Sequence, residues 1–391
     1  MSRKGLVLLT YIFNAILKHK YWPSQLKTAE IILILKPGKN PNSVSSYRPI
    51  SLLPIISKLL ERLLLKRIRS DPNTEEWIPS HQFGFRENHS TVHQIHRITH
   101  KIHQAIENKE YCTSVFLDVS QAFDKVWYPG LLYKIKKYLP ITYFHLLKSY
   151  ISGREFRTRI SDSICNNFAI KSGAPQGSVL GPLLYLLYTA DLPVKANTTM
   201  GTFADDTMIL SANTDPAIAT FTLENHLNQI QEWTNTWKIK INETKSVQVN
   251  FSLRREQCSA VFFNNIQIPE SPGIKYLGIH LDNNLTWKEH ITKKRKQADL
   301  KIKDMHWLIG RKSKLSLDNK VLLYKTIIKR IWVYGVEIWG CASKTNISII
   351  QRCQSKILRM ITNAQWYVSN ITLHEDLKVP LLKEVIKEES T

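Results

Sequence analysis

Two apolar segments that end in carboxylates constrain the fold of this chain more than any other feature. FLDV at 116–119 places Asp118 beside an apolar run, and FADD at 203–206 places Asp205 and Asp206 where two apolar runs meet. The residues around the first motif are rich in β-branched and aromatic types, which is typical of a buried strand. The two runs around the second motif predict a hairpin with the acidic pair at its tip. An unpaired buried carboxylate costs on the order of several kcal/mol, so we expect a partner for these acids.

The acidic residues have two interpretations at this point. Neighbouring residues on a strand face opposite sides, so either Asp205 or Asp206 should point toward Asp118 across the sheet. Carboxylate oxygens suit Mg²⁺, with Mn²⁺ as a substitute, and two such ions roughly 3.5–4 Å apart can activate a hydroxyl and stabilise a leaving pyrophosphate. The alternative is an ordinary solvated turn, because Asp is common in turns, with Asp118 capping the next helix.

The charge balance favours a polyanionic partner. Lys and Arg number 54 against 32 Asp and Glu, which gives a net charge of +22 and a sequence pI near 9.7. A surplus of this size raises the local concentration of nucleic acid around the protein. Two alternatives are a basic protein whose charge only keeps it in solution and one that binds an anionic membrane surface.

Cysteine usage and hydropathy indicate the cellular compartment in which the protein is expected. The 5 cysteines are scattered and form no C-x-x-C pair, so we expect a reduced intracellular protein, nuclear or cytoplasmic and not secreted, without a zinc knuckle. No apolar run approaches the 18 or so residues that a membrane span requires, so no membrane partner is expected. The apolar N-terminal stretch has helical spacing, which favours an amphipathic helix over a signal peptide.

The order of elements indicates an α+β protein with a helical C-terminal part. Strand and helix patterns alternate up to about residue 285, and long basic helical segments follow. An N-terminal helix is expected within 1–25, and another is expected to start at Ser120, which can cap it.

Five histidines from His89 to His103 recur at helical spacing. We favour a helix face over a metal site, because no acidic ligand is interleaved with them.

Several segments, taken in their order along the chain, resemble the reverse transcriptases of non-LTR (LINE-type) retrotransposons, and in particular the jockey-like group. The segments are IFNAILKHKYWPSQLKTAEIILILKPGK (12–39), YRPISLLPIISKLLERLL (47–64), HQFGFRENHST (81–91), FLDVSQAFDKVW (116–127), GAPQGSVLGPLLYLLY (173–188), FADDT (203–207), WKIKINETKS (237–246) and YLGIHLD (276–282). The resemblance implies a right-hand polymerase, with fingers and palm over 1–285 and a basic helical thumb over 286–391. It also implies RNA-directed DNA synthesis, the transfer of deoxynucleotides to a primer 3′-hydroxyl on an RNA template.

The resemblance assigns roles to individual residues. Asp118 and Asp205 are similar to the primary ligands of two Mg²⁺ ions, with Asp206 as the second member of the doublet, and Lys245 matches a general acid toward pyrophosphate. The residues expected to bind the incoming nucleotide are Lys36 or Lys39, Arg48, Phe123, Gln176 and Gly177. Of these, Arg48 suits the triphosphate because its planar fork can bind phosphate oxygens bidentately. Phe123, expected in the helix after Asp118, matches the residue that excludes a 2′-hydroxyl, and core packing is compatible with that role.

The resemblance also sets expectations about partners and completeness. The partners it implies are an RNA template, a DNA primer or RNA–DNA hybrid, deoxynucleotides, and the element's own RNA in a ribonucleoprotein. Because relatives begin with an endonuclease domain, the chain is expected to be a fragment of a longer polyprotein. The basic run KKRK at 293–296 is a nuclear localisation signal or, in the thumb position, a contact to the hybrid backbone. Two alternatives for the whole chain are a catalytically inactive RNA-binding remnant and a maturase-like splicing cofactor.

Overall fold

A four-stranded antiparallel sheet lies at the centre of the structure. The computed structural model describes residues 2–36, 38–43, 46–71, 77–160, 163–254, 256 and 258–390. Within these residues the central sheet has the order β7-β8-β3-β9. Its strands are β7 (Thr199–Phe203), β8 (Asp206–Asn213), β3 (Tyr111–Val119) and β9 (Ile241–Phe251). The expected buried strand and the expected hairpin are therefore both present, and they are neighbours in one sheet.

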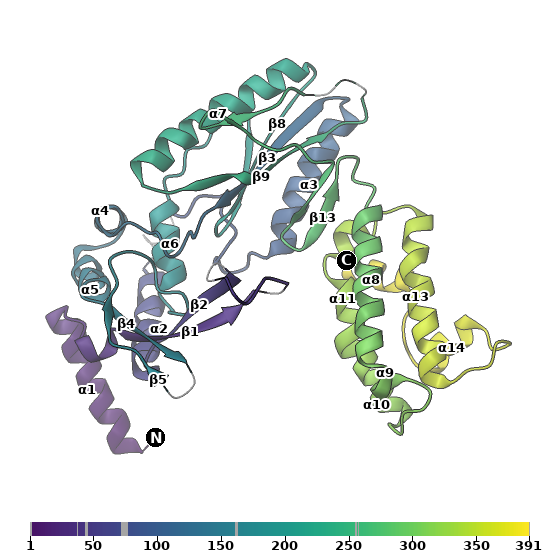
Figure 1. Ribbon diagram of the computed structural model, residues 1–391, viewed down its shortest axis with the longest axis horizontal. Helices are drawn as coiled ribbons and strands as arrows, with labels where there is room; N and C mark the ends of the chain where they lie inside the picture. The colour runs from purple at the N-terminus through teal and green to yellow at the C-terminus, as the bar shows by residue number, and fades with distance from the viewer. Residues whose placement is uncertain are drawn as a thin grey trace.

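Helices cover both faces of the central sheet (Figure 1). On β3 the side chains alternate, as the two-residue period of a strand requires. Cys112 and Phe116 join the apolar cluster that contains helix α3 (Thr91–Glu107). Val115 joins the cluster that contains helix α7 (Pro216–Thr236) on the opposite face. Because β3 is buried from both sides, the position of its carboxyl-terminal end, where Asp118 lies, is firmly fixed.

A second sheet forms the N-terminal part of the molecule, beside the central one. Its order is β2-β1-β4-β5, with β6 paired to β4, and its strands are β1 (Thr28–Leu35), β2 (Tyr47–Leu52), β4 (Glu155–Ile160), β5 (Ser163–Ile164) and β6 (Phe168–Ala169). Strands β1 and β2 form an antiparallel ribbon, whereas β1 and β4 run parallel. The helices of this part are α1 (Arg3–His19), the short 3-10 helix η1 (Ser24–Leu26), α2 (Ile55–Arg69), α4 (Tyr128–Tyr138), α5 (Ile141–Ile151) and α6 (Gly181–Thr189).

Two small antiparallel ribbons follow the central sheet along the chain. They consist of β10 (Phe262–Phe263) with β11 (Ile266–Gln267), and β12 (Gly273–Tyr276) with β13 (Ile279–Asp282). The second ribbon leads directly into helix α8 (Lys288–Asp304) through a turn held by Asp282. One oxygen of Asp282 accepts hydrogen bonds from the amide and hydroxyl of Thr286, both at 2.8 Å, and the other accepts from the amide of Trp287 at 3.0 Å.

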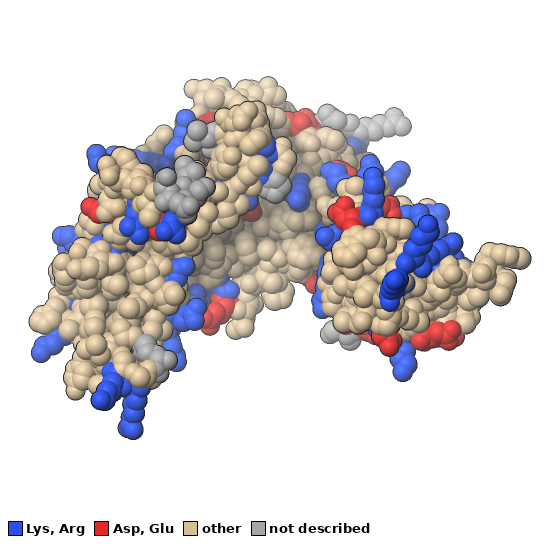
Figure 2. Space-filling view, turned by 60° about the horizontal axis from the view of Figure 1, so that its bottom comes forward, with Lys and Arg blue, Asp and Glu red and all other residues tan. Residues whose placement is uncertain are grey.

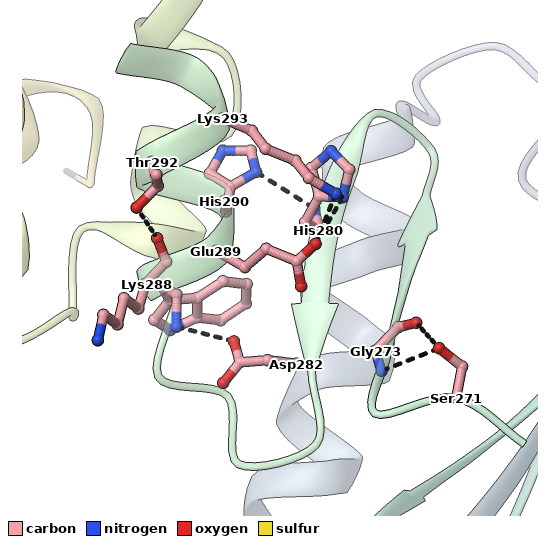
Figure 3. Close-up of polar contacts among 10 residues, drawn as sticks. Ser271, Gly273, His280, Asp282, Lys288, Glu289, His290, Thr292 and Lys293 are labelled. Atoms are coloured by element: carbon pink, nitrogen blue, oxygen red, sulfur yellow. Dashed lines mark hydrogen bonds and ion pairs between the residues drawn. The ribbon is translucent and has the colours of Figure 1, made fainter. Parts of the chain in front are cut away.

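Figure 3 shows a second set of contacts between β13 and α8. The amide of His280 donates to Nδ1 of His290 at 3.2 Å, and Nζ of Lys293 lies 3.2 Å from Nδ1 of His280. Burial lowers the pKa of His290 to about 3, so this histidine is neutral and can accept that hydrogen bond. Helix α8 is therefore fixed to the ribbon at its first turns.

The C-terminal helical region, defined as residues 288–389, packs against the central sheet through its own apolar residues. Trp332, Val336 and Trp339 belong to the same buried cluster as helix α3 and strand β3, and a separate core lies within the region itself. After α8, its helices are α9 (His306–Ile309), α10 (Leu317–Leu323), the π-helix η4 (Tyr324–Ile328), α11 (Lys329–Val333), α12 (Val336–Trp339), α13 (Lys344–Thr362), α14 (Asn370–Asp376) and α15 (Leu382–Glu389).

The structure confirms the predicted α+β class and corrects one element. The helix expected from Ser120 is absent: residues 120–125 form turns, and the next helix begins at Tyr128. The backbone of Gln121 has a φ of 52°, which a right-handed helix excludes. Phe123 therefore lies in a turn and not in a helix. Among the described helices, none is long and apolar enough to cross a membrane.

Candidate active site

The two acidic motifs meet at one end of the central sheet. Strands β3 and β8 are antiparallel, with Leu117 opposite Thr207, so Asp118 and Asp206 are the next residues toward the same end. Phe203 pairs with Asp206, which leaves Ala204 and Asp205 as the two-residue turn of the β7–β8 hairpin. The carboxylates thus come from two adjacent strands and one tight turn.

The acidic groups affect one another's protonation. Burial raises the pKa of Asp205, its own backbone amide lowers it, and the charge of Asp118 raises it again. Asp206 keeps part of its surface accessible, yet burial of its carboxyl group, followed by the charges of Asp205 and Asp118, raises its pKa to about 6. Burial also raises the pKa of Tyr185, and the charges of Asp205 and Asp206 add to that rise. Such mutual repulsion would be relieved by a cation placed among the three carboxylates.

A large cavity opens beside these acids, between the two sheets. Its volume is about 1380 Å³, and it brings together most of the residues that the sequence assigned to catalysis or nucleotide binding, namely Lys36, Arg48, Asp118, Phe123, Gln176, Gly177, Asp205 and Lys245. Lys39 and Asp206 do not line it. Lys39 lies in the loop beyond β1, where its amide donates to the carbonyl of Lys36 at 3.2 Å.

The loop that carries Gln176 is held between the two sheets. The carbonyl of Gln176 accepts a hydrogen bond from the amide of Ser51 on β2 at 2.8 Å, and its side-chain nitrogen donates to Asp124 at 2.8 Å. Gly177 has a φ of +98°, and a Cβ at this position would lie 2.7 Å from the carbonyl oxygen of Ser51. Only glycine allows the loop to approach β2 this closely.

Phe123 forms part of the cavity wall through aromatic contacts. Its ring stacks on Tyr185 with centroids 4.6 Å apart and meets Phe85 edge-on at 5.9 Å. The carbonyl of Phe123 accepts a hydrogen bond from the amide of Ala174 at 2.7 Å, which joins the turn after Asp118 to the Gln176 loop. The ring is thus fixed from two sides and lies half-buried at the edge of the cavity.

The basic residues reach the cavity from opposite walls. Arg48 is exposed on β2, opposite Ile34 of β1. Lys245 is exposed on β9, where the backbone register with β3 shifts between Phe116 and Asp118. At this irregularity the hydroxyl of Ser246 accepts a hydrogen bond from the amide of Asp118 at 3.1 Å. The walls therefore combine carboxylates on the central sheet with cations on both sides of the opening.

Comparison with known proteins identifies the family to which the chain belongs. The family described as "Reverse transcriptase (RNA-dependent DNA polymerase)" matches residues 34–281, a span that contains both acidic motifs, the Gln176 loop and Arg48. The chain belongs to the reverse transcriptase family. The matched part includes the whole central sheet and every strand of the second sheet except most of β1, and the C-terminal helical region lies beyond it.

Similarity along the whole of this chain identifies the group within the family. The chain is 42% identical to the "Probable RNA-directed DNA polymerase from transposon X-element" of Drosophila melanogaster, over 100% of this chain and 44% of that protein. It is also 42% identical to the "RNA-directed DNA polymerase from mobile element jockey" of Drosophila funebris, over 98% of this chain and 43% of that protein. The chain therefore spans less than half the length of these relatives. The predicted kinship with jockey-like non-LTR elements is confirmed.

Structural comparison adds little beyond this. A telomerase from Candida albicans in complex with a fragment of telomeric RNA aligns with 95% of this chain and 68% of its own, at 11% identity and a TM-score of 0.47. A score this low carries no argument about the site.

The reverse transcriptase fold places further residues at the site that sequence reasoning missed. Asp124 lies in the turn after Asp118, where it accepts the hydrogen bond from Gln176. Burial raises the pKa of Asp124, and the hydrogen bond from Gln176 opposes that rise. Tyr47, Phe85 and Lys240 also line the cavity.

Gln82 supports the acidic turn from behind. Its buried side-chain oxygen accepts hydrogen bonds from the amide of Gly84 at 2.8 Å and from the amide of Ala204 at 3.1 Å. The signal in the sequence that could have identified Gln82 is the FGF sequence beside it, where glycine permits a close backbone approach. A Cβ on Gly84 would lie 2.1 Å from the amide nitrogen of Ala204.

Glu61 supports the Gln176 loop in the same way. This fully buried carboxylate on α2 accepts hydrogen bonds from the amides of Val179 at 2.7 Å and Leu180 at 3.3 Å, at the start of α6. Burial raises its pKa, whereas the two amides and then the charge of Arg154 lower it. A glutamate within an apolar helix pattern was the available signal, because such a group needs partners when it is buried.

The carboxylates fit a divalent cation only as an open site. Among the residues that the structure describes, no three His, Cys, Asp or Glu side chains are arranged to hold an ion on their own. Mg²⁺ does not require such a cage, because it keeps several waters and uses one or two carboxylates together with phosphate oxygens of the substrate. Burial is the main reason that the pKa values of Asp205 and Asp206 are raised, and the neighbouring carboxylates add to the rise, so a cation bound here would favour the charged forms.

Proposed function

We propose that this chain carries out RNA-directed DNA synthesis, the transfer of a deoxynucleotide to a primer 3′-hydroxyl on an RNA template. The observation that carries the proposal is the cavity of about 1380 Å³, in which Asp118 and Asp205 face Arg48 and Gln176 across one opening. Membership of the reverse transcriptase family and the surplus of basic residues support it. The natural substrates are then an RNA template, a DNA primer and deoxynucleotides.

Each wall of the cavity has its own part in the proposed reaction. Asp118 and Asp205 would hold two Mg²⁺ ions, with Asp206 beside them, and bound ions of this kind activate the 3′-hydroxyl and stabilise the leaving pyrophosphate. Arg48 and Lys36 would neutralise the triphosphate, and Lys245 would donate a proton to pyrophosphate. Phe123, with its ring fixed against Tyr185, would exclude a 2′-hydroxyl from the sugar.

Gln176 and Gly177 would contact the incoming nucleotide and the template through a loop whose position is set from two directions. The amide of Ser51 fixes the backbone of Gln176, and Asp124 fixes its side chain. Holding reactants in one geometry is the main contribution that a protein makes to phosphoryl transfer. The C-terminal helical region would serve as the thumb and contact the hybrid backbone.

The longer relatives suggest a setting for this activity. Because the chain covers 44% of a relative named for a transposon, we propose that it is the polymerase part of a larger element protein that assembles with the element's RNA. An endonuclease would then belong to the rest of that protein.

Primer extension on an RNA template with Mg²⁺ tests the proposal. We expect the native chain to extend the primer and Asp205→Asn to lose extension while keeping its affinity for hybrid. Asp376→Asn changes an exposed carboxylate of α14, far along the chain from the site, and should extend normally. Hybrid binding without extension by the native chain would favour an inactive RNA-binding remnant. Equal extension by native and Asp205→Asn proteins would show that the metal ligands are misassigned.

A further inference from the structure

A second cavity lies in the C-terminal helical region, between its two longest helices. Helices α8 and α13 run side by side (Figure 1), and a groove of about 760 Å³ opens between their C-terminal halves. We call it the α8–α13 groove. It shares no lining residue with the cavity beside Asp118. Its floor is apolar, with Ile302, Ile357 and Met360.

The rim of the α8–α13 groove is basic. Lys303, Arg311, Lys312 and Lys356 line it with exposed side chains, and none of them forms an ion pair with another described residue. The groove's one acidic lining residue among those described, Asp299, is already paired with Arg295 at 2.9 Å. Figure 2 brings this end of the region forward and shows Lys and Arg side chains gathered over it. The groove therefore presents unneutralised positive charge.

Large aromatic side chains stand exposed next to this charge. Trp307 is 74% exposed and directly follows His306, which lines the groove. Trp366 is 88% exposed and Tyr367 is 72% exposed, both in the loop after α13. Arg359, another lining residue, anchors that loop by donating to the carbonyls of Gln365 and Val368, each at 2.7 Å. Exposed aromatic rings combined with cations are the two features on which nucleic-acid bases stack and along which their phosphate backbone runs.

We propose that the α8–α13 groove binds single-stranded RNA, at a site separate from the polymerase cavity. Exposed rings on which bases stack, combined with cations that follow the backbone, are the two components by which proteins hold single strands. A hybrid duplex would use the cations and not the rings, because its bases are already stacked on each other. An acidic peptide would use the charge, but it offers no planar group to face three exposed rings.

The choice of RNA as occupant rests on the proposed function, which supplies an RNA template with unpaired stretches outside the hybrid. The binding test does not depend on polymerisation, because it uses neither Mg²⁺ nor deoxynucleotides. A failure of extension and a failure of this groove can therefore be told apart.

The experiment measures the affinity of the full chain for a fluorescent single-stranded RNA, with the polymerase cavity filled by one equivalent of unlabelled RNA–DNA hybrid, because an excess of hybrid would also occupy the cations of the groove. Residual binding is expected under these conditions. Trp366→Ala and Trp307→Ala should each weaken it about fivefold or more, the effect of losing one stacked base. Phe221→Ala removes a ring that is 64% exposed on α7 and should change nothing. Circular dichroism of each variant checks that it is folded.

The salt dependence tests the charge separately. Replacing Lys303 and Lys356 together by alanine should reduce the slope of log affinity against log salt by roughly 0.7 for each lysine, as expected for a single strand. The matched control replaces Lys4 and Lys18, two exposed lysines of α1, and should leave the slope unchanged.

Three results would overturn the proposal. Complete loss of RNA binding when the hybrid is added would mean that no second site exists. Unchanged affinity in both tryptophan variants would remove the stacking rings from the site. Displacement of the RNA by poly-glutamate, at concentrations that leave hybrid binding intact, would identify the groove as a docking surface for an acidic protein segment.

Discussion

The side-chain oxygen of Gln82 accepts a hydrogen bond from the amide of Ala204 at 3.1 Å, and in this way a segment remote in sequence holds the turn that presents Asp205. Ala204 has a φ of 59°, a strained conformation for a residue with a side chain. A strained turn keeps its shape only when its surroundings fix it, and the Gln82 contact is the nearest such support. The catalytic geometry is therefore expected to depend on a residue that does not touch substrate.

Replacing Gln82 by alanine tests this dependence. The change leaves the amides of Gly84 and Ala204 without their acceptor, so we expect kcat for primer extension to fall roughly ten- to hundredfold, the cost of a small displacement of reacting groups. The KM for deoxynucleotide should change less, because Gln82 does not line the cavity. Gln229→Ala on the exposed side of α7 is the matched control. Native kcat in Gln82→Ala would contradict the positioning role.

Gly84 should tolerate no side chain. A Cβ there would lie 2.1 Å from the amide nitrogen of Ala204 and 2.8 Å from the carbonyl carbon of Phe203, and both are backbone atoms that cannot rotate away. We expect Gly84→Ala to lower the free energy of unfolding by about 1–3 kcal/mol and to reduce extension as well. Gly153→Ala is the comparison, because nothing lies within 4 Å of its Cβ and its φ of +63° alone should cost about 1–2 kcal/mol. Urea unfolding measures the loss of stability in both variants, and primer extension measures the loss of activity. Full extension activity in Gly84→Ala would mean that the turn can shift without affecting the site.

The contact between Gln176 and Asp124 should affect nucleotide binding more than the chemical step. Asp124→Ala removes the acceptor for the Gln176 side chain, and we expect the KM for deoxynucleotide to rise roughly ten- to a hundredfold, the loss of one hydrogen bond to a charged group. Asp124→Asn keeps an oxygen at the same position and should behave nearly as the native chain. Steady-state kinetics on one RNA template provides both values, and equal KM values for native and Asp124→Ala would rule out this coupling.

Sequence patterns predicted the parts of this fold that depend on local chemistry. The buried strand ending near Asp118 and the hairpin around Asp205 follow from alternating apolar residues and tight-turn geometry. The helix expected from Ser120 failed because the capping signal of serine is weak, and Gln121 turns the chain into the left-handed region instead. That turn serves a tertiary purpose, since it brings Phe123 and Asp124 against the Gln176 loop.

The supporting residues of the site could not be found in the same way. Gln82 and Glu61 act through backbone amides that lie 122 and 118 residues away along the chain, respectively. No periodicity or spacing encodes a contact of that range, because it depends on how two sheets and a helix pack together. Apart from the carboxylates, the residues of the cavity could be predicted only from their resemblance to a family motif. Lys39 shows the limit of that resemblance, because it lies near the motif but does not line the cavity.

Glu61 offers a test of one such long-range contact. Glu61→Ala leaves the amides of Val179 and Leu180 without their acceptor and removes the negative charge that acts on the buried Arg154, so it should lower the free energy of unfolding by about 3–5 kcal/mol. Glu61→Gln keeps one acceptor oxygen and should lose less. Glu107→Ala, at the exposed end of α3, is the neutral control. A loss in Glu61→Ala no larger than in this control, measured by urea unfolding, would show that the carboxylate is not needed to hold α6.

Lys134 should make stability depend on pH in an unusual direction. Its ammonium is fully buried, donates to the carbonyl of Tyr188 at 2.6 Å and pairs with Asp191. Burial lowers the pKa of Lys134 to about 8, and the contact with Asp191 only partly opposes this. Between pH 8 and the ordinary lysine value of 10.5, the unfolded chain holds a proton that the folded chain has released. The contribution of Lys134 to the free energy of unfolding therefore rises with pH across that window and is constant below it.

Subtracting a variant isolates this contribution from those of other groups. The difference in free energy of unfolding between the native chain and Lys134→Met should grow in favour of the native chain as the pH is raised from 8 to 10.5. Lys136→Met, two residues along α4 and exposed, should give a difference that is flat over the same range. The direction is decisive, because a lysine stabilised mainly by its ion pair with Asp191 would have a raised pKa and would lose stability at alkaline pH. A difference that shrinks with pH would thus show that the ion pair outweighs burial at Lys134.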